Sequence, residues 1–96
     1  MLRAAADRLT QIASRSTPGN WRLSGLLASR PEVVAHQGDG GTEHVAEARA
    51  ASAGWIAGVS PAVAGPLADW LRAEAANRLP AEPAVRLARV LLDRLG

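Results

Sequence analysis

The sequence predicts an α+β fold, in which an N-terminal helix precedes a three-stranded antiparallel meander and two or three C-terminal helices pack on the sheet. Three observations support this. Apolar residues recur at helical spacing before residue 16, they alternate between about residues 21 and 46, and helical spacing returns from about Glu47. Because strands and helices are segregated along the chain, the helices are expected on one face of a small sheet.

The N-terminal helix is predicted over roughly residues 2–15. Its apolar face is formed by small and aliphatic residues: Leu2, Ala5, Leu9 and Ile12. Pro18-Gly19 follows directly, and proline and glycine just beyond a helix are its usual terminators.

The meander is predicted from alternation and turn residues. A strand beginning at Trp21 and extending to about Ala28 is followed by a turn at residues 29–32, a second strand over 33–37 and a third over 42–46. Gly38-Asp39-Gly40-Gly41 between the last two strands is a hairpin signal, because glycine supplies the positive φ of tight loops.

The C-terminal half is predicted to be helical. The first helix would place six residues on one face: Val45, Ala48, Ser52, Trp55, Ile56 and Val59. Ser60-Pro61 reads as an N-cap and first helical residue, and Pro66 either kinks the next helix or delays its start. That helix carries a stripe of Val63, Leu67, Trp70 and Leu71, and the last helix, after Pro83, one of Val85, Ala88, Leu91, Leu92 and Leu95.

Composition predicts one small domain, 1–96, with a core of little bulk. The 96 residues include no Phe, Tyr or Cys, so Trp21, Trp55 and Trp70 are expected to be the large, mostly buried core residues. Without cysteine no disulfide framework exists. Charged residues at Arg3, Asp7 and Arg8 interrupt any N-terminal apolar run, so a cytoplasmic protein without membrane association is expected.

The residues that could carry chemistry do not form a recognisable site. A three-residue loop of Asp39, Gly40 and Gly41 would place His36 directly opposite His44, but a third metal ligand is missing. The glycine loop leads into a strand rather than a helix N-terminus, so it does not predict phosphate binding. No nucleophile–base–orienter set is present. We therefore expect no catalytic residue, metal or cofactor, and no enzyme.

Nucleic-acid binding is the competing hypothesis. All eleven basic residues are arginine, yet they are spread among nine acids, and the net charge is only +2. Without an aromatic platform or a helix-turn-helix signature, this composition disfavours nucleic acid and favours ordinary solvated faces. A small nucleic-acid-binding regulator remains the alternative.

One segment resembles a known family. Thr17-Pro18-Gly19-Asn20-Trp21 resembles the ATPGPW turn of small phage and prophage proteins, the Ead-like accessory family common in actinobacteria, and residues 53–63 resemble that family's second segment, with Trp55 in the aromatic place. Asn20 replaces the second proline, and the family's D/N-A start is not matched at Ala53. The resemblance implies a phage-type accessory protein with no established catalytic residue.

Self-association is expected through the C-terminal helix. Leu87 and Val90 lie outside its main apolar face and widen the apolar arc beyond that of a one-sided surface helix. A twofold dimer would bury such an arc. The predicted interface consists of Leu87, Val90, Leu91 and Arg94, and the other expected partner is an unidentified host or phage protein.

Overall fold

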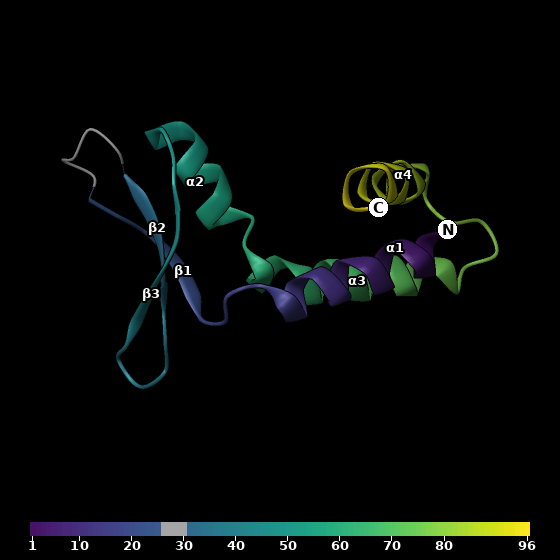
Figure 1. The fold of residues 1–96 in the computed structure, drawn as a ribbon. Helices are drawn as coiled ribbons and strands as arrows, with labels where there is room; N and C mark the ends of the chain where they lie inside the picture. Colours follow the sequence, from purple (N-terminus) through teal and green to yellow (C-terminus); the bar gives the residue numbers. More distant parts are fainter. Residues whose placement is uncertain (26–30) are drawn as a thin grey trace. The chain divides into compact units, whose positions relative to one another are not determined.

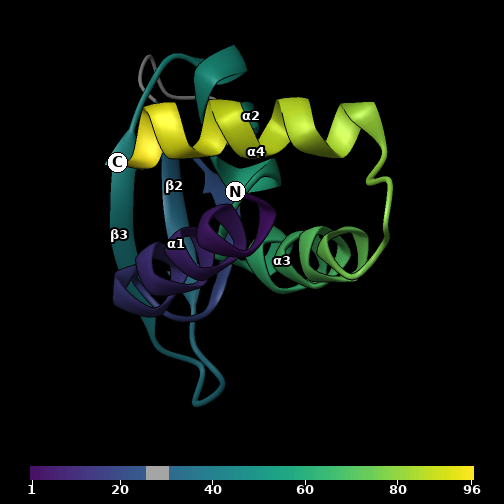
Figure 2. The ribbon, with the colours of Figure 1, turned by 90° about the vertical axis from the view of Figure 1, so that its right-hand side faces the viewer.

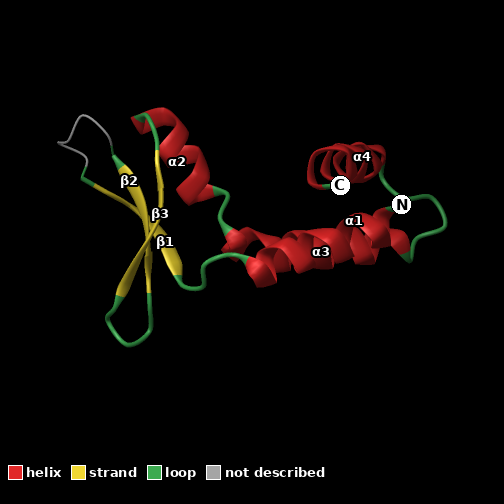
Figure 3. Cartoon of the chain, viewed as in Figure 1, coloured by secondary structure: helices red, strands yellow, loops and turns green. Residues whose placement is uncertain are grey.

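The computed structural model describes residues 1–25 and 31–96, and it confirms the α+β fold (Figures 1 and 3). The elements are α1 (Leu2–Arg15), β1 (Asn20–Ser24), β2 (Glu32–His36), β3 (Thr42–Glu47), α2 (Ala50–Gly58), α3 (Pro61–Ala75) and α4 (Glu82–Leu95). The predicted continuation of the first strand into residues 26–28 and the first half of the predicted turn lie outside the described residues.

The chain divides into two compact units. The helical unit comprises residues 1–16 and 63–96, and the sheet unit comprises residues 17–62. Of the helices that follow the strands, α2 belongs to the sheet unit, whereas α4 and nearly all of α3 are grouped with α1. Packing of α2 on the sheet agrees with the prediction, and within the helical unit α3 and α4 share a core with α1. The prediction of one domain, 1–96, stays a prediction.

The helical unit has a core made mostly of alanine. In both views α4 lies across α1 and α3 (Figures 1 and 2). The buried residues come from all three helices: Leu2, Ala5, Ala6, Ala68, Leu71, Ala84 and Ala88. Small side chains let helix axes approach closely, so this core gains contacts through proximity rather than side-chain bulk. The apolar face predicted for α1 is confirmed, since Leu2 and Ala5 are buried and Leu9 packs against the cluster.

The sheet unit is an antiparallel meander in the order β1-β2-β3, with α2 packed on β1 and β2. Val33, Ala35 and Ala53 are fully buried, which identifies the Val33–Ala35 face of the sheet as the one that α2 covers. Side chains alternate across a sheet. The opposite face, with Arg22 and Val34 at its centre, therefore lies away from α2.

The placement of the tryptophans differs from the prediction. Trp55 is 72% exposed and Trp70 is 40% exposed, while Trp21 is half-buried. The stripe predicted for α2 is rotated, since Ala53 rather than Trp55 faces the sheet. In α3 Leu71 is fully buried as predicted, and Ala68 rather than Trp70 is buried with it. In an alanine-rich helix the closest packing is reached by the smallest side chains, which leaves the bulky ones at the margin.

The start of α3 follows the prediction. The Ser60 hydroxyl accepts a hydrogen bond from the Ala62 N–H at 3.4 Å, which is the N-cap pattern with proline at the first helical position. Pro66 lies inside the helix and does not delay its start, because α3 already begins at Pro61.

Candidate interaction surfaces

The open face of the sheet carries both histidines, but not as a directly opposed pair. The observed register places His36 opposite Thr42 and His44 opposite Val34, so the predicted alignment of the two histidines is wrong by two residues of β3. An even shift leaves both residues on the same face. His44 instead binds Glu32 on the same face, with 2.6 Å between Nδ1 and Oε2.

The loop geometry explains this register. The Gln37 N–H donates to the Gly41 carbonyl at 2.8 Å, so the ladder closes at Gln37 and Gly41, whereas the predicted loop would close it at Gly38 and Thr42. Gly40 has φ +87°, which is the left-handed conformation that glycine tolerates. The Asp39 carboxylate accepts a hydrogen bond from the Gly41 N–H at 2.8 Å. The predicted hairpin is thus confirmed, with a three-residue loop of Gly38, Asp39 and Gly40 that lies one residue earlier in the chain than expected.

Residues around the histidines do not assemble a metal centre. The part of the chain that the structure describes contains no group of three or more His, Cys, Asp or Glu side chains placed to hold a metal ion. Glu43 lies opposite Ala35, on the other face of the sheet from His44. What the open face offers is an exposed polar surface with Arg22, His36 and the His44–Glu32 pair.

The turn that carries the family resemblance has a structural role. The Trp21 indole Nε1 donates to the Thr17 carbonyl at 2.9 Å, which closes the turn over Pro18 and Gly19. Gln37 Nε2 donates to the Pro18 carbonyl at 2.9 Å. Gly19 has φ +112°, and a Cβ at this position would lie 2.7 Å from the His36 carbonyl oxygen. The motif therefore anchors the start of β1 against the end of β2.

The outer side of α2 is an exposed apolar row. Ala51, Trp55 and Val59 follow one another at i, i+4 and i+8, so they lie on one side of the helix. All three are exposed, and Trp55 is the most exposed aromatic side chain among the described residues. We call these three residues the Trp55 row. The sequence analysis missed this surface because it assigned Trp55 to the core. Ala53 and Ala57 lie at helical spacing and form a second possible packing face, and this pattern could have indicated that Trp55 is exposed.

The interface predicted on α4 is divided by the structure. Leu87 and Leu91 pack against the helical core, whereas Val90 is 51% exposed and Arg94 is exposed. The premise that Leu87 lies outside the core-facing side of α4 is wrong, because Ala84 is buried together with Ala88 of the predicted stripe and Leu87 packs against the same core. The exposed part of the predicted interface is thus Val90 and Arg94.

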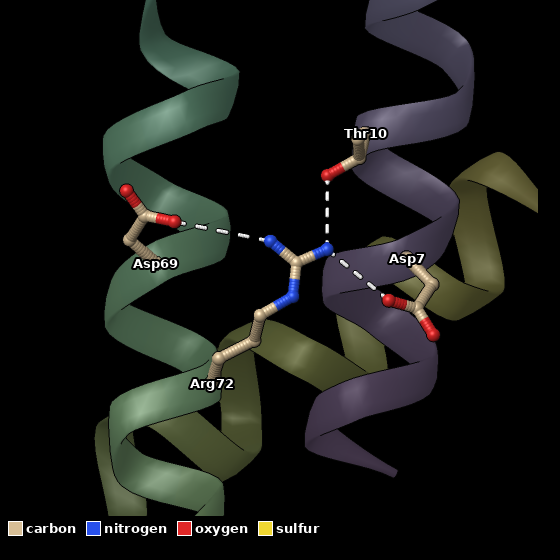
Figure 4. Close-up of polar contacts among 4 residues, drawn as sticks. All are labelled: Asp7, Thr10, Asp69 and Arg72. Carbon is tan, nitrogen blue, oxygen red and sulfur yellow. Dashed lines mark hydrogen bonds and ion pairs between the residues drawn. The ribbon is translucent and has the colours of Figure 1, made fainter.

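The polar contacts of the helical unit are concentrated on two arginines. Arg72 of α3 donates to Asp7 Oδ1 at 3.1 Å and to Thr10 Oγ1 at 3.2 Å, and it lies 3.8 Å from Asp69 (Figure 4). Arg8 of α1 donates to the Leu95 carbonyl at 2.9 Å, at the C-terminal end of α4. These contacts tie α1 to both other helices, so Arg8 and Arg72 serve the fold and are not free to bind a ligand.

Comparisons of the chain with protein-family models, with curated proteins and with solved structures find no match. Among the described residues, no helix is both long and apolar enough to cross a lipid bilayer.

Proposed function

We propose that this protein is a non-enzymatic accessory protein of phage or prophage type that acts in the cytoplasm by binding another protein. The observation that carries the proposal is the 72% exposure of Trp55 beside Val59 on the outer side of α2. Tryptophan is enriched among the residues that dominate binding energy at protein interfaces. The phage lineage is supported by the resemblance of residues 17–21 and of residues 53–63 to the Ead-like family.

Burial and geometry explain why the Trp55 row suits a protein partner. Trp55 lies one residue from Gly54 and three from Gly58, so small neighbours leave the indole ring accessible. An exposed indole presents a large apolar area that has few rotatable bonds to immobilise on binding. The row has Arg49 at the N-cap of α2 as its nearest charge along the chain, which favours a partner with an apolar recess and an acidic rim.

The proposal is tested by affinity capture from host lysate with three versions of the chain. Wild-type protein should capture a specific protein, Trp55→Glu should lose it, and Leu79→Glu should retain it. Leu79 is the matched control because it is 87% exposed and lies in a loop of the other unit. Equal capture by Trp55→Glu and wild type would contradict a role for the Trp55 row.

The alternative function, a small nucleic-acid-binding regulator, is favoured by one feature of the helical unit. This unit contains eight of the eleven arginines and five acids, so its net charge is +3. Arg86 and Arg89 are exposed on α4 and have no hydrogen-bond or ion-pair partner among the described residues.

Nuclease treatment separates the two functions. Under the alternative, partner capture should disappear after nuclease treatment, and Arg86→Gln with Arg89→Gln should weaken binding to duplex DNA. With two or three arginines reaching phosphates, the slope of log affinity against log salt should be about −2 to −3. Under the main proposal, nuclease has no effect on capture.

We also propose that the chain forms a homodimer. The expected α4 interface retains Val90 as its exposed apolar residue, with Arg94 one turn later. Val90→Glu should dissociate a dimer that uses this surface, and sedimentation across the micromolar range measures it. A dimer unaffected by Val90→Glu must use another surface.

A further inference from the structure

The two outer strands of the sheet differ in how their edges are protected. β2 is the central strand, so β1 and β3 each leave one edge without a neighbouring strand among the described residues. The unpaired N–H and C=O groups of such an edge can pair with a strand from another chain, and proteins prevent this with bulges and charged side chains.

β3 has both protections. Val33 lies opposite Ala46, and Val34 lies opposite His44, so Val45 is an extra residue that bulges out of the ladder. A bulge bends and twists the strand and interrupts regular pairing. β3 also carries the acidic side chains of Glu43 and Glu47. This edge is therefore poorly suited to receive another strand.

β1 has no bulge and only one charged side chain. It pairs with β2 in continuous register over all five of its residues, from Asn20 opposite His36 to Ser24 opposite Glu32. It contains no proline, and Arg22 is its one charged residue. No residue of β1 takes part in a backbone hydrogen bond outside this ladder among the described residues.

The side chains of β1 also leave the buried layer of the sheet incomplete. Trp21 lies opposite Ala35 and Leu23 lies opposite Val33, so both belong to the face that α2 covers. Val33 and Ala35 have no exposed surface, whereas Trp21 and Leu23 are half-buried. A strand added beside β1 would extend the apolar layer and cover the outer sides of Trp21 and Leu23.

We propose that a second copy of this chain supplies that strand, and that two β1 strands pair antiparallel about a twofold axis into a six-stranded sheet. A twofold axis perpendicular to a sheet pairs residues of the same face, so it must pass midway between the two copies of one β1 residue, on which the pairing is then centred. Centring on Arg22 would oppose two like charges directly, which is unfavourable. Centring on Trp21 pairs the two Trp21 side chains and places Asn20 opposite Arg22; centring on Leu23 pairs the two Leu23 side chains and places Arg22 opposite Ser24.

This inference goes beyond the proposed function, because it uses a different surface from the Trp55 row. Loss of partner capture in Trp55→Glu does not affect it, and a monomeric chain would leave the Trp55 proposal intact.

The absence of cysteine allows a direct test by disulfide trapping in the full-length chain. Chains carrying Asn20→Cys are mixed with chains carrying Arg22→Cys, and Arg22→Cys chains are mixed with Ser24→Cys chains, under mild oxidation. Opposed Cβ atoms in an antiparallel pair lie about 4.5–5.5 Å apart, close to disulfide range. One of the two mixtures should yield several-fold more cross-linked dimer than the same chains mixed with Glu43→Cys, the matched control on β3.

Sedimentation of the wild-type chain completes the test. The expected result is a dimer at micromolar concentration that persists in Val90→Glu. The proposal would be overturned by a monomer throughout that range, or by cross-linking no greater than with Glu43→Cys. Dissociation caused by Val90→Glu would also overturn it, and would assign self-association to α4.

Discussion

The helical unit and the sheet unit achieve burial in different ways. The three helices of the helical unit share a core cluster of seven buried residues, five of which are alanine, and further leucines pack around it. Among the described residues of the sheet unit, Val33, Ala35 and Ala53 have no exposed surface and lie between one short helix and the short strands. The comparison shows that the larger apolar side chains of the sheet unit, Trp21 and Trp55, lie at its margin or outside its core.

The two units also differ in charge and in polar support. The helical unit has a net charge of +3, and the sheet unit, with three arginines and four acids, has a net charge of −1. In the helical unit Arg8 and Arg72 connect different helices, whereas in the sheet unit the polar contacts lie within the turn and across the sheet. The helical unit is therefore tied together by side chains, and the sheet unit mainly by its backbone ladder.

The largest expected effect comes from the centre of the helical unit. Leu71→Ala should lower the free energy of unfolding by about 2–5 kcal/mol, because it removes a fully buried side chain and leaves a cavity between closely packed helices. Denaturant unfolding followed by circular dichroism measures this. Leu79→Ala, at an exposed loop position, should stay within about 0.5 kcal/mol of wild type. Equal losses in both variants would contradict the assignment of Leu71 to the core.

A smaller loss is expected from the sheet unit. Val33→Ala removes two buried methyl groups beneath α2 and should cost about 2 kcal/mol. Amide hydrogen exchange is the suitable measurement, because it reports on residues 17–62 separately from the helical unit. The backbone amides of β1, β2 and α2 should exchange faster in the variant. Val34→Ala, on the open face of the same strand, is the control and should change exchange less.

The agreement between sequence and structure follows the same division. The spacing of Leu2, Ala5 and Leu9 predicted α1 correctly, because a helix with charged residues on its other side can be buried in one orientation only. The turn residues Pro18-Gly19 and the glycine loop at 38–41 were also recognised, since their backbone requirements are local.

The errors have a common physical origin. In α2 periodicity favoured a bulky face over one formed by alanines, and in α3 it placed Trp70 beside Leu71 where Ala68 is buried. The structure selects the alanine face because it permits closer packing. The predicted pairing of His36 with His44 was wrong because it depends on which two residues close the hairpin. Composition alone cannot decide whether Gln37 pairs with Gly41 or Gly38 pairs with Thr42. The β1 edge without a bulge could be found only once the strand register was known.

Gly19→Ala probes the backbone support of the sheet unit. The substitution forces an L side chain into φ +112° and places its Cβ against the His36 carbonyl oxygen, so it should destabilise by about 1–3 kcal/mol. Thermal unfolding measures the loss. Gly38→Ala is the matched control, since its φ is not positive and a Cβ there would meet no atom within 4 Å. A Gly19→Ala variant as stable as Gly38→Ala would show that the turn can relax without this glycine.

The smallest expected effect distinguishes a surface tryptophan from a core tryptophan. A buried tryptophan replaced by alanine typically costs about 3–5 kcal/mol. Trp55→Ala should instead stay within about 0.5 kcal/mol of wild type, because 72% of the side chain is already exposed. Two small terms act in opposite directions: residual contact of the indole with α2 is lost, while alanine is the better helix former by a few tenths of a kcal/mol. Denaturant unfolding of Trp55→Ala and Leu71→Ala under the same conditions compares the two losses of unfolding free energy directly. If Trp55→Ala lost as much stability as Leu71→Ala, Trp55 would be a core residue and the proposed interaction surface would have no basis.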